Sequence, residues 1–536
     1  MQIIIPMSGL GQRFIDKGYT NPKPLIVVDG KPMIEHIVNL FPNENNISFI
    51  CNENHLKNTN MKSVLNYISP NCKIYSIEQQ KQGPVYAVYK IFNNINDDEE
   101  VIISYCDYGT YWNYEEFLKD TRDRNAHGTI ACYRGFHPHM LGTDNYAFLK
   151  EKEIGSRWME AIKEKEPFTD DRMNEYASNG TYYFKSGAIM KKYFQELMDR
   201  KITLKNEYYV SMVYNLLVED KLNVNIFEID HMLQWGTPYD LEVYNRWSNY
   251  FSNIIKNQPN FEDKLNITTV LPLAGRGSRF VKFGYKYPKP LIDVNGLPMV
   301  VQAIKCLPQS NNNVFICLDD HLKNYPLEQK LKDTYPNCEI YRINQVTEGQ
   351  ACTTEIGINK SNLDLEKPIL ITACDNGVYY DMDKYQNLVD DNANDIIVWT
   401  FKNEPTSKNN PNMYAWLDTD ENDLVKSVSC KNFIEEVHDI EKSYVIIGTM
   451  FFRKGKYFLE GLQKNYEQNI RTNGEFYVDD VLNQNINDGL KVKVFKVQNY
   501  ICWGTPDDYK TYQYWKEFFN KCNWHSYRKE LDITYN

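Results

Sequence analysis

The segment MSGLGQRFIDKGYTNPKPLIVVDGKPM (residues 7–33) returns with few changes as LAGRGSRFVKFGYKYPKPLIDVNGLPM (residues 273–299). Both copies keep a Gly-x-Gly turn, an arginine two positions later and a lysine between two prolines. Gly9 and Lys23 recur 266 positions later, as Gly275 and Lys289. Solenoid repeats have much shorter periods, of about 20 to 50 residues. The spacing therefore predicts two whole domains that arose by duplication.

The correspondence continues through the rest of the chain. Three later residues recur 268 positions on, as the pairs Asp107 and Asp375, Glu207 and Glu475, and Gly236 and Gly504. A polar, proline-containing segment separates the copies and is typical of a domain boundary. We predict a first domain over residues 1–251, a linker over residues 252–266 and a second domain over residues 267–536. The two domains would form a pseudo-dimer within one chain, and further homo-oligomerisation stays open.

Each copy alternates short apolar runs with longer helix-like segments. QIIIPM, SFIC and VIISYC in the first copy correspond to TTVLPL, VFIC and PILITAC in the second, with segments such as KPMIEHIVNLF between them. This alternation predicts two α/β domains, each a mainly parallel sheet flanked by helices. In such sheets the ligand crevice lies beyond the carboxyl ends of the strands. Because the glycine-rich loop follows the first strand, we expect it at this crevice.

Composition and charge narrow the classes of partner. With 42% hydrophobic and 24% charged residues, the chain resembles an ordinary globular protein. A net charge of −11 argues against nucleic acid or an anionic membrane as a partner of the whole surface. No apolar run of about 18 residues could span a bilayer, and the first residues show no signal-peptide pattern. We therefore expect a cytoplasmic protein.

The repeated loop is suited to binding an anion. Glycines allow a tight turn that brings backbone N–H groups close to a phosphate; they are Gly9, Gly11, Gly275 and Gly277. Arginine offers a fork of donors, and lysine in the rigid PKPL segment offers a point charge; these cations are Arg13, Lys23, Arg279 and Lys289. The dinucleotide fingerprint G-x-G-x-x-G is absent, because GLGQRF and GRGSRF have an aromatic residue at its third glycine.

The pattern GxGxRF…GYxxPKPLIxVxGxPM resembles the signature of the sugar nucleotidyltransferases, the NDP-sugar pyrophosphorylase superfamily. The resemblance implies a Rossmann-like, GT-A-like domain in each half, which joins an NTP to a sugar 1-phosphate with Mg²⁺ and releases pyrophosphate. It also implies that the loop glycines and arginines cradle the triphosphate, while Lys23 and Lys289 hold phosphates near the reacting centre. The family's base-recognition segment corresponds to EQQKQG and NQVTEG, with the residues Gln79, Gly83, Gln345 and Gly349.

One aspartate ends an apolar strand in each copy, in SYCDYG and TACDNG. An aspartate that faces the crevice from a strand's carboxyl end can bind the Mg²⁺ that neutralises triphosphate charge. Asp107 and Asp375 are therefore predicted metal ligands, with the capping of a following helix or turn as the alternative. Many relatives carry a second metal-binding aspartate, at a position where this chain has Gln234 and Cys502. Asp240 and Asp508, a few residues later, are predicted helix-start residues rather than metal ligands.

The resemblance further implies a site for the sugar phosphate. AIKEKEPF resembles the family's Glu-Lys-Pro element, and the second copy has only SCKNF at this place. The corresponding candidates are the phosphate-holding lysines Lys165 and Lys431, the glycines Gly180 and Gly448 on the sugar-binding strand, and Glu207 and Glu475 for sugar hydroxyls. For the two glutamates, a surface helix start is an equally good explanation.

The leading hypothesis is a tandem nucleotidyltransferase that transfers a nucleoside monophosphate from an NTP to a sugar phosphate or a similar phosphorylated alcohol. Two alternatives stay open. One half could be a non-catalytic sensor that binds nucleotide or product and regulates the other half. The pair could instead be glycosyltransferases that use an NDP-sugar, which the PKPL lysines and the missing Asp-x-Asp at the strand end disfavour.

Overall fold

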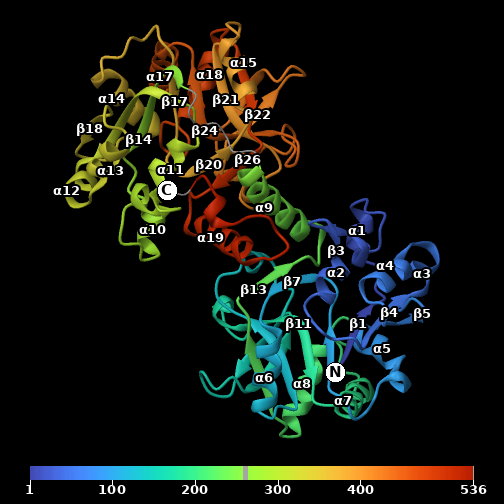
Figure 1. The fold of residues 1–536 in the computed structure, drawn as a ribbon. Helices are drawn as coiled ribbons and strands as arrows, with labels where there is room; N and C mark the ends of the chain where they lie inside the picture. Colours follow the sequence, from blue (N-terminus) through green and yellow to red (C-terminus); the bar gives the residue numbers. More distant parts are fainter. Residues whose placement is uncertain (257–263, 535–536) are drawn as a thin grey trace. The chain divides into compact units, whose positions relative to one another are not determined.

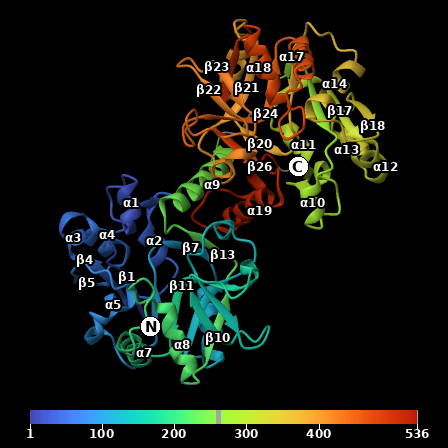
Figure 2. The same cartoon turned by 180° about the vertical axis from the view of Figure 1, so that it is seen from behind.

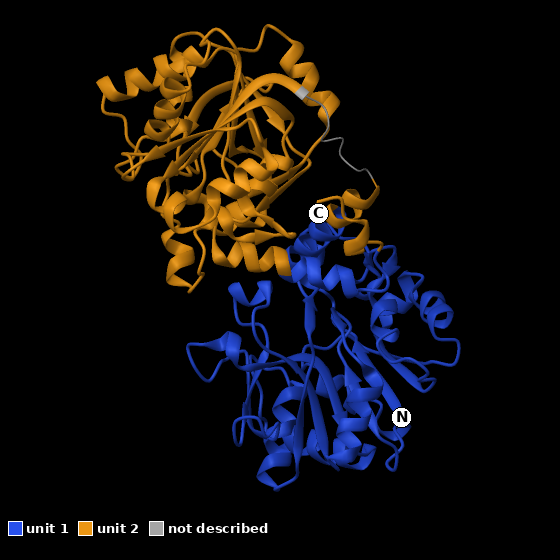
Figure 3. Cartoon of the chain, turned by 60° about the vertical axis from the view of Figure 1, so that its left-hand side comes forward, with its two compact units in different colours: residues 1–249, 514–525 blue, residues 250–513, 526–536 orange. Residues whose placement is uncertain are grey.

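A computed structural model of the chain describes residues 1–256 and 264–534. The chain divides into two compact units, each with an α/β fold (Figures 1, 2 and 3). The first unit comprises Met1–Asn249 and Tyr514–His525, and the second contains the rest of the described chain. The predicted linker, residues 252–266, overlaps helix α9 (Pro238–Lys256) and strand β14 (Lys264–Leu273), and its middle lies outside the described residues.

Residues 514–525 lie in the first unit, whereas the sequence prediction assigns them to the second domain. Aromatic packing explains this difference. The rings of Trp515, Phe518 and Phe519 lie 5.8, 6.4 and 5.6 Å from the ring of Tyr244, between centroids. They come from the last turns of α19 (Pro506–Lys521). An aromatic helix end fits any apolar surface, so its sequence did not indicate which half it would join.

A mixed sheet, mainly parallel in its first half, forms the centre of the first unit. Its strands are, in spatial order, β10 (Met159–Glu164), β9 (Ala147–Glu151), β11 (Tyr176–Phe184), β6 (Val101–Ser104), β1 (Gln2–Met7), β4 (Ile47–Asn52) and β5 (Lys73–Ile77). β8 (Gly128–Tyr133) and β12 (Val224–Glu228) continue the sheet beside β11. Strands β1, β4, β5 and β6 run parallel, as the alternating pattern predicts.

Helices cover both faces of this sheet. Successive side chains of a strand point to opposite faces, so the apolar strands need a helix layer on each side. Ile4 of β1 packs in one core with α5 (Pro84–Tyr89), α7 (Gly187–Asp199) and α8 (Val210–Glu219). Ile3 and Ile5 pack in the opposite core with α2 (Met33–Val38), α4 (Met61–Ile68) and α6 (Tyr114–Asp123). None of the described helices is both long enough and apolar enough to cross a bilayer.

The second unit repeats the strand order of the first. Its sheet contains, in spatial order, β18 (Glu339–Ile343), β17 (Gln309–Leu318), β14, β19 (Ile369–Ile371), β24 (Tyr444–Phe452), β21 (Ile396–Phe401) and β25 (Val492–Lys496). The hairpin β22 (Trp416–Thr419) and β23 (Val425–Ser429) lies beside β24, as β9 and β10 lie beside β11. The duplicated topology agrees with the repeat in the sequence.

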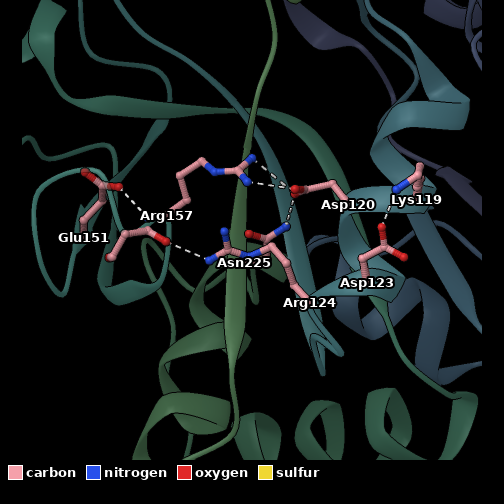
Figure 4. A network of polar contacts seen from close by, with 8 residues as sticks. Lys119, Asp120, Asp123, Arg124, Glu151, Arg157 and Asn225 are labelled. Carbon is pink, nitrogen blue, oxygen red and sulfur yellow. Dashed lines mark hydrogen bonds and ion pairs between the residues drawn. The ribbon is translucent and has the colours of Figure 1, made fainter.

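A polar network fixes the hairpin that carries part of the site (Figure 4). Arg157, two residues before β10, donates two hydrogen bonds to the carboxylate of Asp120 on α6, at 2.8 and 3.3 Å. Asn225 of β12 donates to the same carboxylate at 2.8 Å, and the backbone N–H of Arg157 donates to Glu151 of β9 at 2.7 Å. The far end of β10 reaches Glu164, so this network holds in place the strand that presents Glu164 and Lys165.

Candidate active site

The glycine-rich loop leaves β1 and enters the short helix α1 (Gln12–Asp16). Gly11 caps this helix in the left-handed conformation, with φ 69°, and Gly277 does so in the second half, with φ 61°. A Cβ atom at Gly11 would lie 3.2 Å from the Cβ of Lys23, so glycine suits both the conformation and the space. Gly9 and Gly275 differ, because their φ is not positive and a Cβ there would meet no atom within 4 Å.

A lysine–carboxylate ion pair adjoins the loop. Lys23 begins a short 3-10 turn after Pro22, and its Nζ lies 2.5 Å from Oδ2 of Asp107. The same ammonium donates to the carbonyl oxygen of Gly236 at 2.9 Å. In the second half Lys289 contacts Asp375 and donates to the Gly504 carbonyl at 3.2 Å. The repeat thus brings together residues far apart in the sequence.

Small two-stranded sheets hold these aspartates in place. Asp107 lies between β6 and β7 (Tyr108–Tyr111), and β7 pairs with β13 (His231–Gln234). The Asp107 carbonyl accepts from the N–H of Trp235 at 3.2 Å, and that of Asp375 accepts from Trp503 at 2.8 Å. Burial alone would raise the pKa of Asp375, but Lys289 beside it holds that pKa below its ordinary value. The second-half pair is therefore charged at neutral pH.

Asp240 and Asp508 lie in the first turns of α9 and α19, at the helix starts that the sequence predicts. The Thr237 hydroxyl donates to Asp240 Oδ2 at 2.5 Å and accepts from the Asp240 N–H at 3.2 Å, at the start of α9. Thr505 and Asp508 repeat both bonds at 2.6 and 3.2 Å. Burial raises the pKa of both carboxyl groups. These reciprocal bonds occupy the carboxylates with the helix start.

A second group of polar residues, here called the lysine–tyrosine wall, consists of Lys165, Glu207 and Tyr209. Lys165 follows β10 with φ 59°, and its Nζ donates to the Tyr209 hydroxyl at 2.8 Å. That hydroxyl donates to Glu207 Oε2 at 2.6 Å. Glu207 therefore acts on Lys165 through the tyrosine. The second half has the same residue types at Lys431, Glu475 and Tyr477, with the Lys431 ammonium 4.9 Å from the centroid of the Tyr477 ring.

Residues of the glycine-rich loop and the ion pair, together with Lys165 and Tyr209 of the lysine–tyrosine wall, line one cavity in the first unit, with a volume of about 380 Å³. Such a volume suits a small organic ligand, since ligand pockets commonly measure about 300 to 1,000 Å³. Six predicted site residues line this cavity: Gly11, Arg13, Lys23, Asp107, Lys165 and Gly180. Gly180 adopts φ 96° and packs on Tyr105, where a Cβ would lie 3.1 Å from the ring. Gly448 has φ 92° at the matching place in the second half.

Four predicted residues of the first half are not among those that line the cavity: Gly9, Gln79, Gly83 and Glu207. Gln79 is exposed, as is its counterpart Gln345. Gly83 and Gly349 have a packing reason, because a Cβ at Gly83 would lie 2.7 Å from the Tyr208 carbonyl oxygen and one at Gly349 would clash with the backbone of Phe476. Their place beside the site is thus explained without contact to a nucleobase.

The cavity-lining residues that the sequence prediction missed include Tyr105, Glu164, Asn179, Tyr182 and Tyr209. The Nδ2 atom of Asn179 is buried and has no hydrogen-bond partner among the described residues. An unpaired buried amide is costly, so this group points to a ligand that accepts a hydrogen bond. Alternation along β11, within the motif NGTYYF, was the available signal, but the twist at Gly180 changes which side chains face inward.

Each ion pair offers a single carboxylate as a ligand for Mg²⁺. Within residues 1–256 and 264–534, no group of three or more His, Cys, Asp or Glu side chains could hold a metal ion. Mg²⁺ usually keeps several waters and binds through one or two carboxylates together with substrate phosphates. The single carboxylate of Asp107 or Asp375 fits that mode, and it does not fit a metal site made by protein alone.

Comparisons with known proteins give matches to part of the chain. Residues 2–226 match the profile of the family Nucleotidyl transferase. These residues lie in the first unit, so this part of the chain resembles that family. The bifunctional protein GlmU of Buchnera aphidicola subsp. Baizongia pistaciae is 25% identical over 228 residues, which are 42% of this chain and 46% of that protein. The GlmU protein of Methanococcus maripaludis is 32% identical over 105 residues, 18% and 23% of the two chains. The match thus spans less than half the length of these curated relatives.

Two solved structures are also similar to part of the chain. The nucleoside-diphosphate-sugar pyrophosphorylase of Vibrio cholerae RC9 is 19% identical and covers 46% of this chain and 100% of its own, with a TM-score of 0.39. The inositol-1-phosphate CTP transferase of T. maritima is 15% identical and covers 46% of this chain and 93% of its own, with a TM-score of 0.35.

Proposed function

We propose that each half transfers a nucleoside monophosphate from an NTP to a sugar phosphate or a related phosphorylated alcohol and releases pyrophosphate. The observation that carries this proposal is the first cavity, where two sets of cations face one space. Arg13 and Lys23 come from the loop side, and Lys165 comes from the lysine–tyrosine wall. Two separate cationic groups can bind two phosphorylated substrates, and the cavity is large enough for the reacting groups of both substrates.

The chain's residues position both reactants for an in-line displacement. Arg13, Lys23 and the loop N–H groups would hold the triphosphate, and Lys165 would hold the phosphate of the acceptor. An oxygen of the acceptor phosphate attacks the α-phosphorus of the NTP. The new P–O bond forms as the bond to the β-phosphate oxygen breaks, and pyrophosphate leaves with that electron pair. No general base is needed, because the attacking phosphate is already an anion.

Asp107 and Asp375 would hold the Mg²⁺ that the family typically uses. When bound, this ion neutralises the negative charge on the phosphates. Arg13, Lys23, Arg279 and Lys289 would stabilise charge on the leaving pyrophosphate, where preorganised cations lower the barrier most. We further propose that the product serves the synthesis of glycan or surface-polysaccharide precursors in the cytoplasm.

A pyrophosphate-release screen tests the proposal. The four common NTPs and dTTP are each combined with a panel of sugar 1-phosphates and polyol phosphates in the presence of Mg²⁺. Release that depends on both substrates is the expected result. An NDP-sugar hydrolysed or transferred without any pyrophosphate-dependent reverse reaction would instead support a glycosyltransferase.

A further inference from the structure

Two asparagine clamps fix how the lysine–tyrosine walls of the two halves correspond. In the first half, the side chain of Asn215 on α8 accepts from the N–H of Ile162 on β10 and donates to its carbonyl, both at 2.9 Å. In the second half, Asn483 on α18 (Val478–Asn487) makes the same two bonds with Val428 on β23, again at 2.9 Å. The strand and the helix therefore share one register in both halves.

This register pairs Glu164 with Cys430 on the strand side and Ser211 with Asp479 on the helix side. The lysines that follow confirm it, since Lys165 and Lys431 both have positive φ, 59° and 49°. In the first half the Ser211 hydroxyl donates to Glu164 Oε2 at 2.6 Å. In the second half the Cys430 thiol donates to Asp479 Oδ2 at 3.8 Å. The carboxylate has thus moved from the strand to the helix, and its neutral partner has moved the opposite way.

A reciprocal exchange of this kind keeps one carboxylate beside the phosphate-holding lysine. Burial raises the pKa of Glu164, and burial together with Asp480 raises the pKa of Asp479 to about 6. Retaining a partly buried carboxylate at such a cost is typical of functional sites. Asp480, its neighbour, is explained by structure, because it is buried and accepts a hydrogen bond from the Thr472 hydroxyl at 2.8 Å. Among the described residues, the only hydrogen-bond donor to the Asp479 side chain is the weak thiol of Cys430.

The surroundings of the two carboxylates differ in polarity. The first half places Tyr105, Asn179 and Tyr182 around its cavity, and Ser178 donates to the Tyr182 hydroxyl at 3.0 Å. The residues 268 positions later are Ala373, Ile447, Met450 and Ile446. Ile446, Ile447 and Met450 are buried, so apolar side chains replace a hydrogen-bonded tyrosine and an unpaired amide. The second half has kept the lysine and a carboxylate but has apolar residues at these four positions.

We propose that Asp479 is the side chain with which the second half recognises its acceptor, by accepting a hydrogen bond from a hydroxyl or ammonium group on a phosphorylated alcohol. Lys431 holds the phosphate of this acceptor, and the apolar residues select a less polar body than the first half binds. The two halves therefore use different acceptors. This proposal rests on the proposed function, since it assigns the acceptor class of the second site.

The test measures binding in the full-length chain with the acceptor site of the first half disabled by Lys165→Ala, since Lys165 is the lysine that would hold the acceptor phosphate there. Isothermal titration uses glucose 1-phosphate, ribitol 5-phosphate and phosphoethanolamine, with inorganic phosphate as the reference that needs Lys431 alone. We expect at least one organic phosphate to bind more tightly than inorganic phosphate. Asp479→Asn should weaken that ligand at least about tenfold, the usual effect of losing a hydrogen bond to a charged group, and leave inorganic phosphate unchanged.

Two matched variants separate recognition from folding. Asp480→Asn removes the adjacent carboxylate and should leave the affinity for the organic phosphate unchanged. Cys430→Glu combined with Asp479→Ser rebuilds the Glu164–Ser211 pair in the second half and should restore binding that Asp479→Ser alone loses. Whether the hydroxyl-bearing or the ammonium-bearing ligand binds most tightly identifies the donor.

The proposal is overturned if Asp479→Asn binds the organic phosphate as tightly as its parent, or if no organic phosphate exceeds inorganic phosphate. Pyrophosphate release by the wild-type chain tests the proposed function separately. Binding that depends on Asp479 without any pyrophosphate release would refute nucleotidyl transfer and support recognition by Asp479. Pyrophosphate release that is unchanged by Asp479→Asn would refute acceptor recognition by Asp479 but leave the proposed nucleotidyl transfer intact.

Discussion

The ammonium of Lys23 lies 2.5 Å from the carboxylate of Asp107, and Lys289 forms the same ion pair with Asp375. The side chains of Lys23 and Asp107 are only 15% and 32% exposed, so each is largely withdrawn from water. The proposed function assigns the lysine to phosphate and the aspartate to Mg²⁺. Before substrate arrives, the two opposite charges satisfy each other. A bound metal–phosphate substrate would supply both with new partners of opposite charge, which keeps the exchange electrostatically balanced.

Removing the carboxylate should abolish metal-dependent turnover in one half. Asp107→Asn or Asp375→Asn keeps the size of the side chain but removes the charge that Mg²⁺ needs, so the affected activity should fall on the order of a hundredfold or more. The measurement is pyrophosphate release against Mg²⁺ concentration. Asp240→Asn is the matched control: its carboxylate accepts the Thr237 hydroxyl in the first turn of α9, so this variant should not change the Mg²⁺ concentration at half-maximal rate. Full wild-type turnover in excess chelator would count against the metal assignment.

The Tyr209 hydroxyl should position Lys165 for the acceptor phosphate. Tyr209→Phe removes the bridge between Lys165 and Glu207, so the acceptor KM should rise by about two- to tenfold, the effect of one neutral hydrogen bond, with kcat nearly unchanged. Tyr477→Phe should have a smaller effect, because Lys431 lies over the ring and donates to the Met413 carbonyl at 3.4 Å. Equal effects in both halves would contradict this difference.

The stability of the second unit should depend on pH through Asp479. The pKa of Asp479 in the folded protein, about 6, lies above its ordinary value of 3.8. The folded state therefore favours the protonated carboxyl group, and its contribution to the free energy of unfolding is fully present below pH 3.8 and lost as the pH rises through 6. Asp479→Asn should therefore raise Tm by a few degrees at pH 7.5, on the order of 1 to 2 kcal/mol, and by much less at pH 4.

A control with the opposite sign lies in the same unit. Asp381 accepts from the Lys384 N–H at 3.1 Å as the cap of α15 (Met382–Asp390), and this bond lowers its pKa. Its contribution is present above its ordinary pKa and lost as the pH falls, so Asp381→Asn should lower Tm at pH 7.5. Thermal unfolding at both pH values measures the two differences. Identical pH dependence for both variants would exclude the assigned roles.

The end of α19 should stabilise the first unit. Phe518 is fully buried there, and Phe518→Ala should cost about 3 to 5 kcal/mol. Hydrogen exchange should rise first in the amides around Tyr244. Phe458→Ala, at an equally buried position on α17 (Gly455–Glu467), is the control and should raise exchange in the second unit. Faster exchange in the second unit alone after Phe518→Ala would contradict the division of the chain.

The fold could be predicted from sequence patterns because the same patterns occur in both copies of the duplicated domain. The apolar runs alternate with helices in both copies, and the strand orders match. The glycine-rich loop and the ion-pair residues were identifiable because their chemistry depends on residue type at short spacing. Lys165 and Gly180 entered only through the family resemblance. Asn179 escaped prediction because its inward direction depends on how β11 turns at Gly180, which period-two alternation does not describe. Tyr105 lies just beyond the end of β6, where the alternation of the strand no longer applies.

The exchange of Glu164 and Ser211 for Cys430 and Asp479 was hidden for a different reason. Each substitution removes or adds a charge at one position, and only the fold shows that the two positions face each other. When the two copies are aligned position by position, these positions therefore count as two unrelated substitutions. In the fold the two positions lie together, so each half has one carboxylate at the same place, and this cannot be inferred from spacing along the chain.

The division of labour between the halves gives the most discriminating prediction. Lys23→Ala and Lys289→Ala each remove the ammonium from one ion pair, and each leaves a carboxylate without its lysine. Because duplicated domains have separate cores, each variant should lose one nucleotidyl transfer activity and retain the other. If the acceptors differ, a substrate panel should show two distinct losses. A sensor half would instead keep maximal turnover in its variant and change only the response to nucleotide or product. The reading of two enzymes is wrong if one variant eliminates all pyrophosphate release while the other, equally well folded, retains all of it for every acceptor.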